Sequence, residues 1–136
     1  MAGPSFPRAL LALNSVAIGL IGALYLFDPN LLLSLYGLET GSAGMDNMLR
    51  ASYGGLYLVS AALFMIGARS EPRRRDALAF LGMFMAAAAL GRVASMVAVG
   101  APPLTITGLL AYECVAAGLA LLAYKGSPSS ARARHA

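Results

Sequence analysis

Charge is scarce in this sequence. Only 12% of its 136 residues are charged, whereas 59% are hydrophobic. Soluble domains usually carry about 25% charged residues, so a chain with so few needs a solvent other than water around much of its surface. The length of the chain fits a single domain.

Cysteine, histidine and tryptophan are also nearly absent. The chain has no Trp, one cysteine (Cys114) and one histidine (His135), which is the penultimate residue. A lone cysteine excludes an internal disulfide and a CxxC redox or zinc site. The formal net charge of +4 comes from basic residues in loops and ends, without a basic helix face or an aromatic stacking platform. Nucleic-acid binding is therefore not expected, and the sequence predicts neither a metal site nor a cofactor.

What the chain does contain is four long apolar stretches: Ala9–Phe27, Met48–Ala68, Ala77–Val99 and Leu104–Tyr124. Each is close to the roughly 20 residues that a helix needs to cross the hydrocarbon core of a bilayer. Four such segments cannot form a closed β-barrel, so helices are the remaining way to span. A soluble helical bundle would need polar faces, and Met83–Leu90 has none. We predict an all-α integral membrane bundle of four transmembrane helices, forming a single domain over residues 1–124.

The first stretch raises the alternative of a secretory signal peptide, because Arg8 precedes the apolar run. The run continues to Asp28-Pro29 without an A-x-A cleavage pattern, so we interpret it as a retained helix. Asp28–Asn30 is typical of a helix stop and turn. The apolar segment Leu31–Leu38 is too short to span and is predicted to be a short interfacial helix.

The remaining connections are read from their composition. Gly41–Gly44 is predicted to be a flexible loop and Arg69–Asp76, with a proline inside it, a tight charged turn. Gly100–Pro103 should break the chain between the last two helices. Lys125–Ala136 is rich in Ser, Ala and Arg, and we expect a disordered basic cytoplasmic tail.

Orientation follows from the basic residues near the helix ends, which gather on the cytoplasmic side of membrane proteins. Eight of the ten basic residues fall on one side of the predicted bundle: Arg8, Arg69, Arg73, Arg74, Arg75, Lys125, Arg132 and Arg134. The opposite connections contain only the acidic Asp28, Glu39 and Asp46. We therefore predict that both termini are cytoplasmic. A dual-topology exporter would need a nearly balanced count.

Three charged residues fall inside the predicted helices: Arg50, Arg92 and Glu113. At a rise of 1.5 Å per residue, they lie about 6, 12 and 13 Å below the outer surface. Because a short turn joins the last two helices, Arg92 and Glu113 should be level with each other and form an ion pair. Arg50 has three possible roles: pairing with Asp46, reaching the outer headgroups, or facing a ligand. Without Asp46, the three charges leave a surplus positive charge that would favour an anionic group.

Other polar and small residues surround these charges. One polar stripe of the second helix consists of Asn47, Arg50, Gly54 and Tyr57, with Tyr53 beside it. Gly54 with Gly55, and Gly91 with Ser95 flanking Arg92, are predicted packing residues that let a neighbouring helix approach. The candidate ligand-binding residues are Asn47, Arg50, Tyr53, Tyr57, Arg92 and Glu113.

The pattern Asn47-x-x-Arg50-x-x-Tyr53-Gly54-Gly55, followed by Gly91-Arg92-x-x-Ser95 and by Glu113, resembles a family of small bacterial four-helix membrane proteins known as domain of unknown function 4345. The resemblance covers roughly Leu10 to Tyr124. It implies the fold and an importance for these polar positions, but no activity, substrate or cofactor. We expect a location in the bacterial cytoplasmic (inner) membrane.

Three functional hypotheses follow. The first is a non-enzymatic binding or accessory protein that holds an amphiphile, an anionic ligand or a partner helix at the outer polar cluster. The second is a small membrane enzyme acting on a lipid-like substrate, with Glu113 as general acid/base. The third is a transporter or channel formed by an oligomer. No catalytic residue is assigned, and the expected partners are membrane lipids and either another membrane protein or further copies of the chain.

Overall fold

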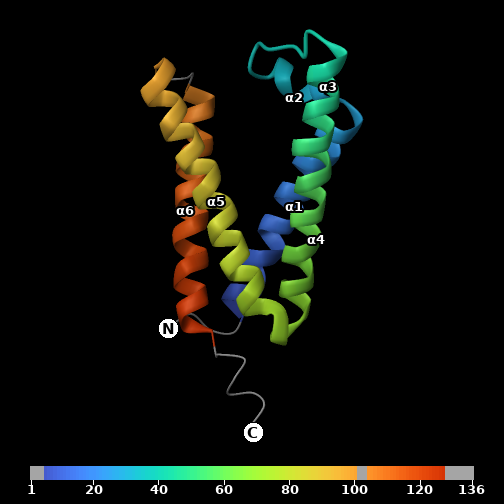
Figure 1. Ribbon diagram of the computed structural model, residues 1–136. Coiled ribbons are helices and arrows are strands. Elements are labelled where there is room, and N and C mark those ends of the chain that lie inside the picture. The colour runs from blue at the N-terminus through green and yellow to red at the C-terminus, as the bar shows by residue number, and fades with distance from the viewer. Residues whose placement is uncertain (1–4, 101–103, 128–136) are drawn as a thin grey trace, which may run out of the picture. The chain divides into compact units, whose positions relative to one another are not determined.

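A computed structural model describes residues 5–100 and 104–127. Within these ranges the chain is helical and contains no strand. Four helical segments are long and apolar enough to cross a membrane: Ser5–Phe27, Ala43–Arg69, Glu71–Val99 and Thr107–Gly126. The predicted fold class, an all-α protein with four such helices, is confirmed. The elements shown in Figure 1 are α1 (Ser5–Phe27), α2 (Pro29–Ser34), α3 (Ala43–Leu49), η1 (Arg50–Gly55), α4 (Leu56–Arg69), α5 (Glu71–Val99) and α6 (Leu104–Gly126).

The first helix and the interfacial segment both differ slightly from their predicted bounds. Helix α1 begins at Ser5 instead of residue 9. The short helix α2 starts at Pro29 and ends at Ser34, so it is shifted toward the N-terminus from the predicted Leu31–Leu38. Asp28 is its N-cap, because its carboxylate accepts a hydrogen bond from the N–H of Asn30. Proline is favoured at the first helical position, which explains why the chain turns into a new helix here instead of a loop.

The second long helix begins earlier than predicted. Ser42 caps α3 by accepting a hydrogen bond from the N–H of Met45 at 3.2 Å, so part of the predicted Gly41–Gly44 loop is helical. Elements α3, η1 and α4 then follow each other without a break from Ala43 to Arg69. In the middle segment, η1, the N–H of Leu56 bonds to the carbonyl of Ala51, five residues back, which is the π-helical register.

The predicted charged turn over Arg69–Asp76 is wrong. Only Ser70 separates α4 from α5, and Glu71–Asp76 form the first turns of α5. Pro72 falls in the first turn, where its missing N–H would have no helical partner in any case. Glu71 in the same turn complements the helix dipole. The basic residues Arg73–Arg75 therefore lie on a helix.

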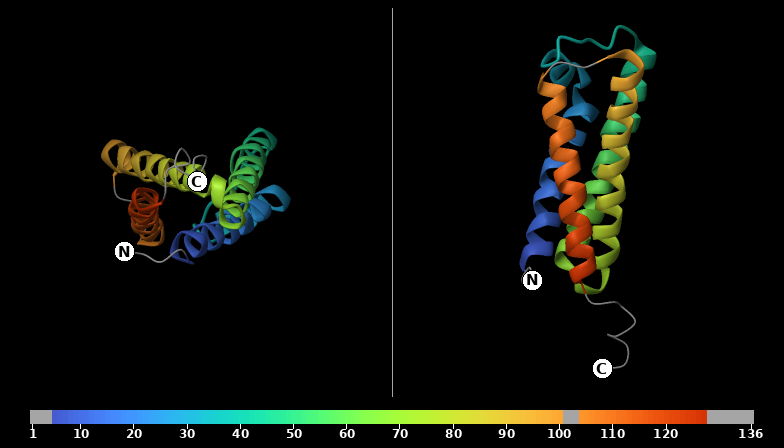
Figure 2. Two further views of the ribbon diagram at one scale, coloured as in Figure 1. Left: turned by 90° about the horizontal axis from the view of Figure 1, so that it is seen from below. Right: turned by 90° about the vertical axis from the view of Figure 1, so that its left-hand side faces the viewer.

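The last two helices run side by side in opposite directions (Figures 1 and 2). Gly100, with φ of 96°, ends α5 in a conformation that favours glycine, and residues 101–103 of the predicted break lie outside the described residues. Helix α6 continues to Gly126, so the first two residues of the predicted tail are helical. Residues 128–136 of that tail also lie outside the described residues.

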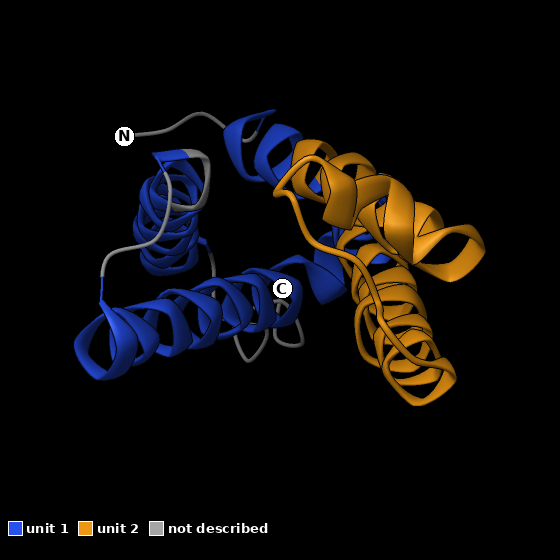
Figure 3. Ribbon diagram, turned by 90° about the horizontal axis from the view of Figure 1, so that it is seen from above, with its two compact units in different colours: residues 1–11, 66–136 blue, residues 12–65 orange. Residues whose placement is uncertain are grey.

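The chain divides into two compact units (Figure 3). Unit 2 spans residues 12–65 and contains the packing of α1 against η1 and α4. Unit 1 consists of residues 1–11 and 66–136 and contains the α5–α6 pair. The start of α1 belongs to unit 1, where a Cβ added to Gly67 would meet the side chains of both Leu11 and Ala77. A single domain over residues 1–124 stays a prediction.

Candidate functional site

Arg92 and Glu113 form an ion pair between α5 and α6. The Nε of Arg92 donates to both carboxylate oxygens of Glu113 at 2.9 Å. The Glu113 side chain is 8% exposed and that of Arg92 is 31% exposed. The short connection between the helices and their antiparallel course bring the two residues to one level, as the sequence predicts. The pair leaves Glu113 charge-compensated and deeply buried.

Arg50 lies at the start of η1, and its contacts are made with its own unit. Its Nε donates to Oδ2 of Asp46 at 2.6 Å. Its Nη1 donates to the carbonyl of Leu26 and, at 3.0 Å, to that of Phe27. These carbonyls belong to the last turn of α1, where no helical partner is available. Arg50 therefore caps the C-terminus of α1, where a cation is also favoured by the helix dipole.

The contacts of Arg50 and Arg92 settle the local charge balance. Of the possible roles of Arg50, pairing with Asp46 is present. Each of the two arginines thus has a carboxylate of the chain beside it, and the surplus positive charge that would favour an anion is compensated. Arg50 belongs to unit 2, whereas Arg92 and Glu113 belong to unit 1. Their assembly into one polar cluster stays a prediction.

The tyrosines of the predicted stripe form an aromatic row. The ring of Tyr53 lies 5.1 Å from that of Tyr25 and 5.4 Å from that of Tyr57, in the range of favourable aromatic pairs. Tyr25 comes from α1 and was outside the residues that the sequence pattern points to. Asn47 is exposed on α3. The row therefore packs η1 and α4 against α1.

Within unit 2, close helix packing occurs at Gly54 and not at Gly55. A Cβ added to Gly54 would lie 3.0 Å from the Cα of Leu26, whereas the nearest atom to a Cβ on Gly55 would be 3.9 Å away. On the facing helix, a Cβ on Gly22 would lie 3.0 Å from the backbone nitrogen of Leu58. Glycine at positions 22 and 54 thus lets the backbones of α1 and η1 approach each other. The sequence reading missed Gly22, although it lies in an otherwise bulky apolar run.

The packing role of Gly91 and Ser95 stays a prediction, because unit 1 alone places no helix against them. No described atom lies within 4 Å of a Cβ added to Gly91, and both residues are exposed. The tighter packing of α5 on α6 lies nearer the other end of the pair, where a Cβ on Gly82 would touch Ala120 at 3.6 Å. Within unit 1, the small residues that flank Arg92 are not covered by α6.

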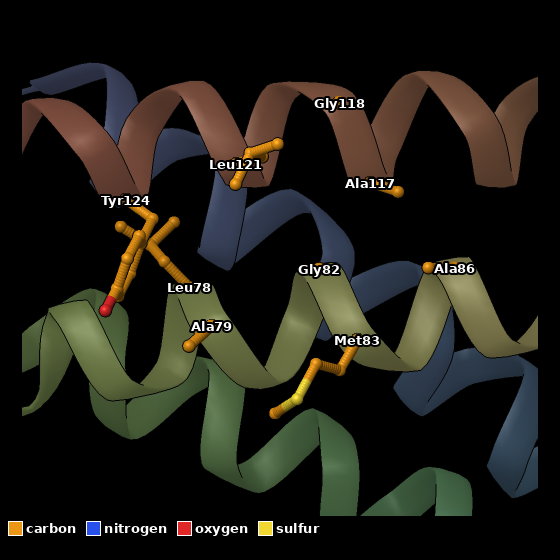
Figure 4. A pocket seen from close by; sticks show the side chains of 9 residues that line it. All are labelled: Leu78, Ala79, Gly82, Met83, Ala86, Ala117, Gly118, Leu121 and Tyr124. Atoms are coloured by element: carbon orange, nitrogen blue, oxygen red, sulfur yellow. The ribbon is translucent and has the colours of Figure 1, made fainter.

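The structure also contains an apolar groove between α5 and α6, which the sequence reading did not predict (Figure 4). Its volume is about 410 Å³, within the range of roughly 300–1,000 Å³ that small-molecule sites occupy. Tyr124 stands at one end, and the other lining residues are apolar: Leu78, Ala79, Gly82, Met83, Ala86, Ala117, Gly118 and Leu121. Ala79, Gly82 and Ala86 are spaced by three and four residues, which places them on one face of a helix. This spacing is the sequence signal that could have indicated the groove.

Arg75 lies at the tyrosine end of this groove, and Arg74 precedes it in the sequence. The guanidinium carbon of Arg75 lies 4.5 Å from the ring centre of Tyr124, which is a cation–π contact. The Nε atoms of Arg74 and Arg75 are buried, and neither has a hydrogen-bond partner among the described residues. A buried donor left unpaired costs about 1–3 kcal/mol. This end of the groove therefore combines an aromatic wall with a cationic side chain whose Nε is buried and unpaired.

Comparison with protein families matches residues 6–124 of the chain to the model of a domain of unknown function (DUF4345). The chain belongs to this family. No curated protein and no solved structure matches it. In this DUF4345 member the matched range contains the Arg92–Glu113 pair, the Arg50 cap and the apolar groove. Within the described ranges, no group of three or more His, Cys, Asp or Glu side chains is placed to hold a metal ion.

Proposed function

We propose that this DUF4345 protein is a non-enzymatic membrane protein that holds the apolar chain of an amphiphile in the groove between α5 and α6. The observation that carries the proposal is the groove itself, an apolar hollow of about 410 Å³ with a polar tyrosine at one end. An apolar cavity with a polar group at its mouth suits a molecule with a hydrocarbon chain and a polar head.

The two other functional hypotheses have less support. An acid/base catalyst needs a carboxyl group that can exchange a proton with substrate. Glu113 is buried and both of its oxygens accept from Arg92. A site for an anion at Arg50 and Arg92 is disfavoured for a similar reason, since both have carboxylate partners. A transporter would need a polar path, whereas the groove lining is apolar apart from Tyr124.

The proposal includes a location in the bacterial cytoplasmic membrane with both termini on the cytoplasmic side. Its support is the positive-inside pattern of the basic residues. Arg73–Arg75 at the start of α5 and Lys125 at the end of α6 lie at one end of an antiparallel pair. On this orientation the groove opens in the cytoplasmic half of the membrane, and the Tyr124 end faces the headgroups of the inner leaflet.

The test is to fill the groove and measure what the protein retains. A Cβ on Gly118 meets no described atom within 4 Å, so Gly118→Leu places its side chain in the groove without disturbing the helix contact. Gly108→Leu is the matched control, because Gly108 is on the same helix, is equally unobstructed and does not line the groove. The full chain is purified in mild detergent, and bound amphiphiles are quantified by mass spectrometry.

We expect the unmodified protein and the Gly108→Leu variant to retain the same amphiphile, and Gly118→Leu to retain less than about a tenth of it. Equal retention by the two variants, or no retained amphiphile in the unmodified protein, would contradict the proposal.

A further inference from the structure

The arginines at the tyrosine end are in register with the groove. Arg74 and Arg75 lie four residues before Leu78 and Ala79, which line it. Residues four apart in a helix lie on the same face, one turn from each other. The groove face of α5 thus continues, one turn further toward the start of the helix, to the positions of two arginines.

These guanidinium groups are not neutralised by the acidic residues of their own turn. Glu71 and Asp76 flank them in sequence, but among the described residues neither acid forms an ion pair with Arg74 or Arg75. Arg75 instead lies over the Tyr124 ring. Two cations with buried, unpaired donors at the end of an apolar groove have the charge and hydrogen-bonding capacity to receive an anion that is attached to an apolar chain.

We infer that the groove takes a phospholipid with an anionic headgroup, whose phosphate is bound by Arg74 and Arg75 while one acyl chain lies along Met83 and Leu121. This inference rests on the proposed function and specifies its ligand class. Guanidinium groups bind phosphate through charge-assisted, often paired, hydrogen bonds. The groove is cationic at one end and apolar along the rest, which matches the headgroup and the chain of a lipid. A partner helix fits less well, because it would have to bury an acidic side chain at the same point.

The test compares two lipids with identical acyl chains, an anionic phosphatidylglycerol and a zwitterionic phosphatidylcholine. The full-length protein in mild detergent is titrated with each, and bound lipid is counted by native mass spectrometry. We expect the unmodified protein to bind phosphatidylglycerol at least tenfold more tightly. Glycerol phosphate, which carries the anion without a chain, should not compete. A ratio near one, or competition by glycerol phosphate, would overturn the inference without any variant.

The test variant is Arg75→Gln, with Arg73→Gln as the matched control. Arg73→Gln changes the net charge by the same amount, but Arg73 is exposed. Attraction to an anionic surface alone is worth about fivefold per basic residue. We expect Arg73→Gln to stay within that factor and Arg75→Gln to remove the preference for phosphatidylglycerol. Equal effects of the two variants would show that only diffuse charge is involved and would overturn the inference.

Gly118→Leu separates the inference from the proposed function. If it lowers binding of both lipids while Arg75→Gln behaves like Arg73→Gln, the groove holds amphiphiles without the phosphate contact, and only the inference fails. If Gly118→Leu changes the binding of neither lipid, the proposed function fails as well. If it instead abolishes self-association of the protein and leaves lipid binding unchanged, a second copy fills the groove, and both are overturned.

Discussion

Breaking the Arg92–Glu113 pair should destabilise the protein strongly, and the two residues should behave as one unit. Both oxygens of Glu113 accept from the Nε of Arg92 at 2.9 Å, and the carboxylate is almost fully buried. Removing one partner of a buried pair costs about 3–5 kcal/mol in soluble proteins, and a lone charge in a membrane helix costs about 2.5–3.5 kcal/mol. Because about a third of the Arg92 side chain is exposed, we expect the lower end, about 3 kcal/mol, for each of Glu113→Gln and Arg92→Gln.

The double variant should recover part of this loss, since it leaves no stranded charge. We expect it to be about 2 kcal/mol more stable than the sum of the single effects predicts, within the usual range for directly coupled residues. The assay is reversible unfolding of the purified protein in mixed micelles, with exposed Arg73→Gln as a control that should change stability by less than about 0.5 kcal/mol. Single effects that add within about 0.5 kcal/mol would refute the reasoning, because they would mean that the two side chains do not share their stabilisation.

Three further predictions concern unit 2 and the orientation of the chain. Gly54→Ala should destabilise the protein by about 1–3 kcal/mol through overpacking, whereas Gly55→Ala should be neutral or slightly stabilising in the same unfolding assay; equal effects would contradict the close approach at Gly54. Arg50→Gln should raise hydrogen-exchange rates in the last turn of α1, and unchanged rates would mean that the arginine does not cap that helix. Reporter fusions after Lys125 and within Glu39–Gly44 should report the cytoplasm and the exterior respectively, and a report of the same side for both would contradict the topology.

The long helices were predictable because length and apolar composition are local properties of the sequence. Their ends depend on capping residues and on the position of proline, and the predicted bounds did not take these fully into account. The residues around Pro72 looked like a turn because they combine a proline with several charges. Ser70 just before a Glu-Pro pair is equally a helix start, and the structure uses it in that way.

The predictable part of the site is the part set by topology. Antiparallel neighbours with a short connection bring Arg92 and Glu113 to one level, so their pairing follows from counting residues. The cap by Arg50 was not predictable, because its acceptors are backbone carbonyls of α1, which carry no sequence signal. The groove depends on the register and separation of α5 and α6. It also depends on how much space the two helices leave beside Gly82 and Gly118. Those quantities are set by packing and not by composition.

Photo-crosslinking can show whether an acyl chain occupies the groove. A phospholipid with a photoactivatable group in its acyl chain is added to the full-length protein in mild detergent, and the modified residues are identified by peptide mass spectrometry. Leu121 lines the groove and is 53% exposed, whereas its neighbour Leu122 does not line it and is 66% exposed. On α5, Met83 in the groove and Leu90 outside it are 65% and 69% exposed. We expect several-fold more adduct at Leu121 and Met83 than at Leu122 and Leu90. Adducts that follow exposure, with Leu122 and Leu90 modified at least as often, would contradict this expectation.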